Sequence, residues 1–72
     1  MFHEFDIVRL KENDLTAGVL TSYTGIIVDI VDGSDCCTVE FFDDNGDTIY
    51  ASVMKEYFFN ELVLVESTSD KR

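Results

Sequence analysis

Basic residues are scarce in this sequence of 72 residues. Fifteen aspartates and glutamates stand against five lysines and arginines, which gives a formal net charge of −10. A surface of this sign repels the phosphates of nucleic acids and the headgroups of anionic membranes, so we expect neither as a partner. It attracts basic proteins and speeds their association. The same charge also keeps a small protein soluble without any specific partner, and charge alone does not choose between these roles.

Histidine and cysteine are too few for the common metal and catalytic sites. His3 is the only histidine, and the only cysteines, Cys36 and Cys37, are adjacent. A structural zinc site needs about four nitrogen or sulfur ligands, and neighbouring residues on a strand point to opposite faces. No catalytic motif surrounds His3. We therefore expect no cofactor, no bound metal and no enzymatic activity.

Long apolar runs are also missing, and the opening segment is acidic. The opening MFHEFD lacks the basic and apolar regions of a signal peptide, and no segment has the ~20 apolar residues of a membrane span. Adjacent cysteines are poorly placed for a stabilising disulfide, so we expect free thiols in a reducing compartment. These observations predict a cytoplasmic protein.

The sequence has no proline, repeat or low-complexity segment, which predicts one domain over residues 1–66 and a flexible tail at 67–72. Within the domain, apolar and polar residues alternate as they do in strands. We expect Leu15 and Val19 to anchor a long connection at 11–22, and a helical turn within 54–60. The predicted strands are residues 4–10, 23–31, 36–43, 47–53 and 62–66.

These elements predict an all-β fold, a small five-stranded SH3-like barrel with one short helical turn before the last strand. An OB-type barrel is the less favoured alternative at this length. Gly25 lies inside the second predicted strand, where a glycine indicates a bend or a close approach of another segment.

The first predicted hairpin turns at an Asp-Gly pair, residues 32–33. A two-residue loop and a four-residue loop both fit the pattern. Either register puts Ile26 and Val28 on the same face as Cys37 and Val39, because side chains alternate between faces. We therefore expect that face to form the core.

The second predicted hairpin turns at residues 44–46, which read Asp-Asn-Gly. A two-residue Asn-Gly turn would place apolar residues of one strand opposite polar residues of the next. A three-residue bulged turn, with Gly46 left-handed, aligns the apolar sets instead. The pairs that follow are Asp43 with Asp47, Phe41 with Ile49, Val39 with Ala51 and Cys37 with Val53.

This register assigns the remaining side chains of the three central strands to an outer face. The residues of that face are Ile27, Asp29, Thr38, Glu40, Phe42, Thr48, Tyr50 and Ser52. Carboxylates that surround exposed aromatic rings are typical of an interface, although turns favour aspartate and sheets expose some aromatic rings by chance. The predicted partner-binding residues are Asp29, Glu40, Phe42, Asp43, Asp44, Asp47 and Tyr50.

The aspartates around the second turn do not have the spacing of a calcium-binding EF-hand. Such a loop needs glycine at its sixth position and glutamate at its twelfth. Counted from Asp43, these positions hold Thr48 and Met54. Adventitious calcium binding at the turn is the weaker alternative.

A second aromatic segment, EYFF at residues 56–59, has two interpretations. Consecutive aromatic residues cannot all point inward from a strand or turn. The segment either closes one end of the barrel, which we favour, or forms a second interface.

Four segments resemble a small bacterial family of SH3-like barrels of unknown function, which is similar to the barrel of the nitrile hydratase beta subunit. They are EFDIVRL, AGVLTSYTGIIVDI, TVEFFDDNGDT and ELVLV, which together cover most of residues 4–65. The resemblance implies the same barrel fold for this chain.

The charge and the resemblance together predict an acidic protein-binding inhibitor. Our lead hypothesis is a bacterial immunity protein that neutralises a basic toxin of the nuclease type by occluding its active site. The alternative is an SH3-like accessory or activator module of a metalloenzyme. The partner is thus a basic protein, either a toxin or an enzyme subunit, and the last strand could also pair with a second copy of the chain.

Overall fold

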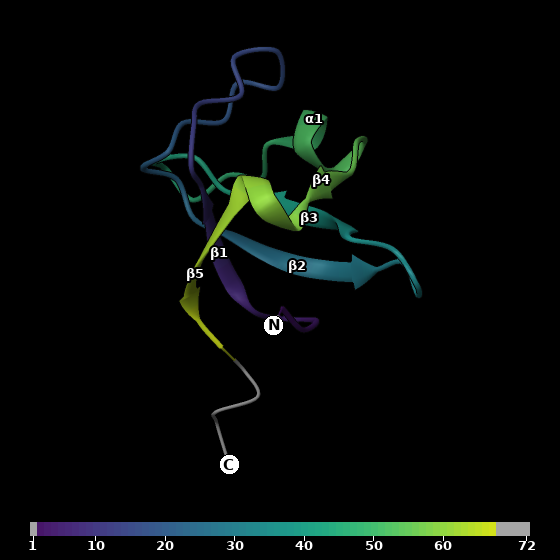
Figure 1. The fold of residues 1–72 in the computed structure, drawn as a ribbon. Coiled ribbons are helices and arrows are strands. Elements are labelled where there is room, and N and C mark those ends of the chain that lie inside the picture. Colours follow the sequence, from purple (N-terminus) through teal and green to yellow (C-terminus); the bar gives the residue numbers. More distant parts are fainter. Residues whose placement is uncertain (1, 68–72) are drawn as a thin grey trace.

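The protein forms a single antiparallel sheet of five strands, as the computed structural model of residues 2–67 shows (Figure 1). The sheet order is β4-β3-β2-β1-β5, with a short helix, α1 (Tyr50–Val53), and a 3₁₀ turn, η1 (Phe59–Glu61). The predicted all-β class, the number of strands and the helical turn before the last strand are confirmed. The strands are β1 (Ile7–Leu10), β2 (Gly25–Ile30), β3 (Cys36–Phe41), β4 (Tyr57–Phe58) and β5 (Leu62–Glu66).

The sheet bends strongly, so that β1 and β5 run across β2 and β3 (Figure 1). Its concave side holds the core. The rings of Phe41 and Tyr57 meet edge to face there, with centroids 5.4 Å apart, a favoured arrangement of aromatic pairs. The buried apolar residues are Val8, Leu10, Ala17, Val19, Ile27, Cys37, Val39, Phe41, Tyr57 and Leu62.

The long connection at 11–22 is anchored by Val19 but not by Leu15. Asp14 and Val19 exchange two backbone hydrogen bonds, of 2.8 and 2.9 Å, which close a small loop between them. Val19 is fully buried, whereas Leu15 lies in the loop and is 78% exposed. The prediction for Leu15 was wrong because the bridge directs this part of the loop away from the core.

A bulge in β2 reverses part of the predicted core. Ile27 pairs with Val39 and Asp29 with Thr38, so the register shifts and Val28 has no opposite residue. Ile27 is therefore buried, while Val28 is exposed and Ile26 lies half-buried. The prediction that Ile26 and Val28 face the core, with Ile27 outside, was wrong, since a one-residue shift exchanges the faces of a strand.

Gly25 opens β2 where another segment comes close. A Cβ atom at this position would lie 2.7 Å from both the Phe41 ring and the Val39 side chain. Only glycine leaves room for these two core residues, so the predicted close approach is confirmed.

The predicted three-residue bulged turn is present in the second hairpin. The amide of Gly46 donates to the Asp43 carbonyl (2.9 Å), and the amide of Asp43 donates to the Asp47 carbonyl (2.9 Å). Gly46 has φ +83°, the left-handed conformation that the turn requires. The Ile49 amide then donates to the Phe41 carbonyl (2.8 Å), so the predicted pairing extends to Phe41.

The fourth predicted strand, residues 47–53, is wrong beyond that point, because the chain turns into α1. Ser52, expected on the outer face, is fully buried. Its hydroxyl accepts a hydrogen bond from the Phe41 amide (3.2 Å) and lies 2.7 Å from the Ile49 carbonyl and 3.2 Å from the Val39 carbonyl. The Ser52 side chain thus binds the backbone of β3 in the place of the expected strand. The predicted pairs of Val39 with Ala51 and Cys37 with Val53 do not form.

The aromatic segment that follows divides between the core and the surface. Tyr57 pairs with Cys37 in β4 and is fully buried, while Phe58 is 52% exposed. Phe59 stacks on Phe2 with ring centroids 5.2 Å apart. Ser67 is buried; the rest of the predicted tail, residues 68–72, lies outside the described residues.

Replacing Ser52 with alanine tests whether its hydrogen bonds to β3 stabilise the fold at the point where α1 replaces the expected strand. Ser52→Ala would leave the Phe41 amide and the Val39 carbonyl without this partner in the interior. We expect the free energy of unfolding in urea to fall by about 1–3 kcal/mol. Ser22→Ala, a change at an exposed serine, should alter it by less than about 0.5 kcal/mol. Equal stability of the two variants would contradict the assigned role of Ser52.

Candidate functional site

The second hairpin brings two of the predicted site residues together on the outer face. Phe42 pairs with Thr48 across the hairpin, and the Thr48 hydroxyl donates to a Glu40 carboxylate oxygen (2.7 Å). Glu40 and Phe42 alternate along one strand, so their side chains lie on the same face. Both are half-buried. The hydrogen bond restrains the Glu40 carboxylate on the face that it shares with Phe42.

Asp29 extends this face toward β2. It pairs directly with Thr38, which lies two residues before Glu40 on β3. Residues directly opposite each other in an antiparallel pair share a face, so Asp29 joins Glu40 on the outer side. Its side chain is exposed.

The three aspartates of the turn have different roles. The Asp43 carboxylate accepts hydrogen bonds from the amides of Asn45 (2.9 Å) and Asp47 (3.0 Å), and it thereby stabilises the turn. Asp44 and Asp47 are exposed, and the structure gives their carboxylates no such role within the described residues. The sequence alone does not show which of the three stabilises the turn, because aspartate is common throughout turns.

Tyr50 is separated from the sheet. It is the first residue of α1 and is 77% exposed. The predicted outward direction of its ring is confirmed, but its position opposite the strands is not. We name Asp29, Glu40, Phe42, Asp43, Asp44 and Asp47 the acidic face and treat Tyr50 as its neighbour in sequence.

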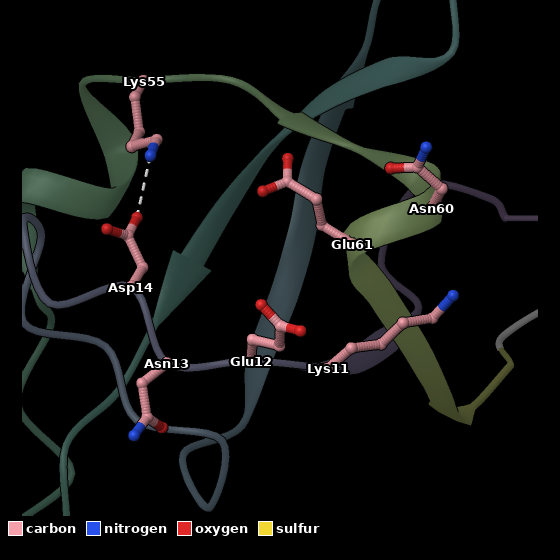
Figure 2. Close-up of a pocket in the computed structure, with 7 residues that line it drawn as sticks. All are labelled: Lys11, Glu12, Asn13, Asp14, Lys55, Asn60 and Glu61. Atoms are coloured by element: carbon pink, nitrogen blue, oxygen red, sulfur yellow. Dashed lines mark hydrogen bonds and ion pairs between the residues drawn. The ribbon is translucent and has the colours of Figure 1, made fainter.

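A polar pocket that was not foreseen lies between three segments of the chain (Figure 2). Its volume is about 400 Å³, and carboxylates, ammonium groups and amides line it. Of the described residues in this lining, none is serine, cysteine or histidine, so it offers hydrogen bonds and charge without a nucleophile. The lining residues are Lys11, Glu12, Asn13, Asp14, Lys55, Asn60 and Glu61.

Asp14 connects the walls of this pocket. One of its carboxylate oxygens accepts hydrogen bonds from the Lys55 ammonium group (2.8 Å) and the Tyr57 hydroxyl (2.8 Å), and the other accepts from the Ala17 amide (3.2 Å). The Lys55 nitrogen also lies 4.8 Å from the centre of the Tyr57 ring. These contacts fasten the long connection to the segment before β4.

The pKa values agree with a structural role for this cluster. The hydrogen bond from Lys55 lowers the pKa of Asp14 below its ordinary value. Burial, together with the hydrogen bond to Asp14, raises the pKa of Tyr57 well above its ordinary value. Asp14 therefore stays charged and Tyr57 stays protonated near neutral pH, so neither group is poised to exchange a proton.

The two cysteines are free, as predicted, and differ in their surroundings. Burial raises the pKa of the Cys37 thiol to about 11, which keeps it protonated and unreactive. Cys36 is half-buried, with its sulfur 3.6 Å from a Glu56 carboxylate oxygen.

Comparisons with family models, curated proteins and solved structures find no match for this chain. Within residues 2–67, no three or more histidines, cysteines, aspartates or glutamates are arranged to hold a metal ion. No helix in the same range has the length and apolar character needed to cross a membrane. The acidic face and the polar pocket are thus the two sites that the geometry offers.

Asp14→Asn tests the polar cluster, because it removes the charge and leaves one acceptor oxygen where Asp14 uses two, one for the Ala17 amide and the other for the Tyr57 hydroxyl and Lys55. The pKa of Asp14 in the folded protein lies below its ordinary value of 3.8, so its carboxylate stabilises the fold above that pH. This contribution is lost as the pH falls through the lowered pKa. We expect the free energy of unfolding of the variant to be about 1 kcal/mol lower than that of the wild type at neutral pH. Its stability should also fall less than that of the wild type between about pH 5 and about pH 2.

Asp32→Asn is the matched control, since it makes the same charge change at an exposed position. Its free energy of unfolding should stay within about 0.5 kcal/mol of the wild type. Urea unfolding across the pH range measures both variants. The same pH profile for Asp14→Asn as for Asp32→Asn would contradict the role given to the cluster.

Proposed function

We propose that the protein binds a basic protein and inhibits it, in the manner of an immunity protein that neutralises a toxin of the nuclease type. The observation that carries this proposal is the exposed pair Asp44 and Asp47 at the end of the acidic face. The turn uses Asp43, whereas these two carboxylates stabilise nothing else among the described residues. Several carboxylates in one short turn repel one another, and binding of a cationic surface would relieve that repulsion.

The remaining charges support a cationic partner. Asp70, Lys71 and Arg72 lie outside the described residues, which leaves fourteen acidic and three basic side chains, or a net charge of −11. One of the three cations, Lys55, already forms an ion pair with Asp14 at 2.8 Å. A field of this strength accelerates the approach of a basic protein and orients it before contact.

Aromatic residues next to the carboxylates supply the apolar part of the contact. Phe42 is half-buried within the acidic face, and Tyr50 presents its ring to solvent at the start of α1. Aromatic residues at the centre of an interface commonly carry much of the binding free energy, while charges around them set the rate and the specificity. Occlusion of a cationic active site by such a surface would block its anionic substrate.

Removal of the two exposed charges tests this proposal. The full chain is used to recover a partner from the source cell at low salt, and the affinity of the purified partner is then measured by calorimetry. We expect a basic protein whose activity is lost on stoichiometric addition of the chain. Asp44→Asn/Asp47→Asn should weaken its binding by about tenfold or more, and high salt should weaken it further.

Asp32→Asn/Asp35→Asn is the matched control, because it removes two exposed aspartates from the other hairpin. Its affinity should stay within about threefold of the wild type, apart from the small loss of general steering. A partner that is not basic, or equal affinities of the two double variants, would contradict the proposal. Binding that survives about 1 M salt would favour the accessory module of a metalloenzyme instead.

A further inference from the structure

The residue Phe5 has a backbone conformation that a bulky side chain rarely adopts. Its φ angle is +72°, and every other residue with a positive φ in the described range 2–67 is a glycine. In this left-handed region the Cβ atom lies too close to the backbone, so glycine is favoured there and asparagine is tolerated. A phenylalanine at this position therefore carries backbone strain.

The strain arises in a tight turn at residues 3–6. The Asp6 amide donates to the His3 carbonyl (3.2 Å), which closes a four-residue turn with Phe5 in third place. A positive φ at this place is typical of a type II turn, where glycine or asparagine is usual. The preference of the turn therefore does not explain a phenylalanine here.

Hydrogen bonds on both sides of Phe5 hold it in the strained conformation. The His3 amide donates to the carboxylate of Asp6 (2.7 Å), a residue that is fully buried. The Phe5 amide donates to the Ile27 carbonyl (2.7 Å), and the Ile27 amide donates to the Asp6 carbonyl (3.0 Å). Strain of this kind persists only where the surrounding structure fixes the residue, and it is concentrated at functional sites.

The Phe5 side chain contributes little to the core. It is 61% exposed, whereas Phe2 in the same segment packs against the buried residues. The residue thus departs from two local preferences at once, since an aromatic ring is exposed and a bulky side chain stands on a left-handed backbone. Departures of this kind are expected where a residue serves binding more than folding.

Phe5 lies next to the acidic face, at its β2 end. Its amide is bonded to Ile27, and Asp29 of the acidic face is two residues further along the same strand. Val28, the bulged residue between them, is 36% exposed. Glu4, which precedes Phe5, is also exposed. The ring is therefore an apolar feature among carboxylates, which suits a partner surface that is basic around an apolar depression.

We propose that Phe5 is an aromatic anchor for the basic partner, and that the strained turn presents its ring for this contact. The inference rests on the proposed inhibitory function and adds a residue to its interface. Aromatic anchors commonly carry much of the binding free energy of an interface, and a backbone that is fixed before binding lowers the entropy cost of association. A residue that fits the turn better should therefore make the chain more stable and its binding weaker.

Phe5→Asn tests the first half of this expectation, because asparagine tolerates the left-handed conformation. In urea unfolding of the full chain, the equilibrium constant for folding should rise by about threefold or more. Phe5→Ala removes the same ring but keeps a Cβ atom that the turn disfavours, so it should not gain this stability. A Phe5→Asn variant that is less stable than the wild type would show that the ring supports the fold, and would overturn the proposal.

Phe58→Asn is the matched control, because it makes the same change at a phenylalanine that is 52% exposed and has an ordinary φ of −80°. It should not raise the stability, since there is no left-handed strain to relieve at this position. A gain equal to that of Phe5→Asn would show that the strain is not its cause, and would overturn the proposal.

Calorimetry with the purified basic partner tests the second half. Phe5→Asn should weaken its binding by about tenfold or more, while Phe58→Asn should stay within about threefold of the wild type. Equal affinities of these two variants would overturn the proposal, and so would the failure of the full chain to recover a protein partner.

The double variant Asp44→Asn/Asp47→Asn separates this inference from the proposed function. Weaker binding by Phe5→Asn alone would support the anchor and contradict the role given to the charges. Weaker binding by the double variant alone would support the charges and overturn the anchor. We expect both to bind more weakly than the wild type, and only the double variant to lose part of the salt dependence.

Discussion

The hydrogen bonds of the Asp43 carboxylate to the amides of Asn45 and Asp47 fix the register on which this structure depends. They hold a three-residue turn, and side chains that alternate along β3 then face the core or the solvent accordingly. Phe41 enters the core and Phe42 stays with Glu40 outside. A one-residue change in this turn would shift Thr48 relative to β3, so Thr48 would no longer lie opposite Phe42 or reach the Glu40 carboxylate.

Hydrogen bonds from Ser52 and Asp14 hold the segments that do not belong to the long strands. Ser52 binds the backbone of β3 where a fourth long strand would otherwise pair, and the chain can then turn into α1 and return as β4. Asp14 joins Lys55 and Tyr57, which attaches the long connection to that returning segment. In a domain this small the apolar area is limited, so hydrogen bonds, buried at Ser52 and partly exposed at Asp14, help to hold the irregular segments in place.

The sequence predicted features that depend on neighbouring residues and missed those that depend on distant ones. The bulged turn and β5 follow from local spacing, and both are present. The bulge at Val28 was hidden because Ile26, Ile27 and Val28 are all apolar, so no alternation indicates which of them faces inward. The polar pocket joins residues from three segments, and only the polar run KEND at residues 11–14 gave any signal of it.

The acidic face, with its turn held by Asp43, is the surface on which the proposed function depends. We propose that the acidic face is the surface that meets a basic partner. Mapping of amide chemical shifts in the labelled chain, as the purified partner is added, tests it most directly. The account predicts changes at Asp29, Glu40, Phe42, Asp44 and Asp47. Changes confined to the residues of the polar pocket or to β5, with the acidic face unaffected, would contradict it.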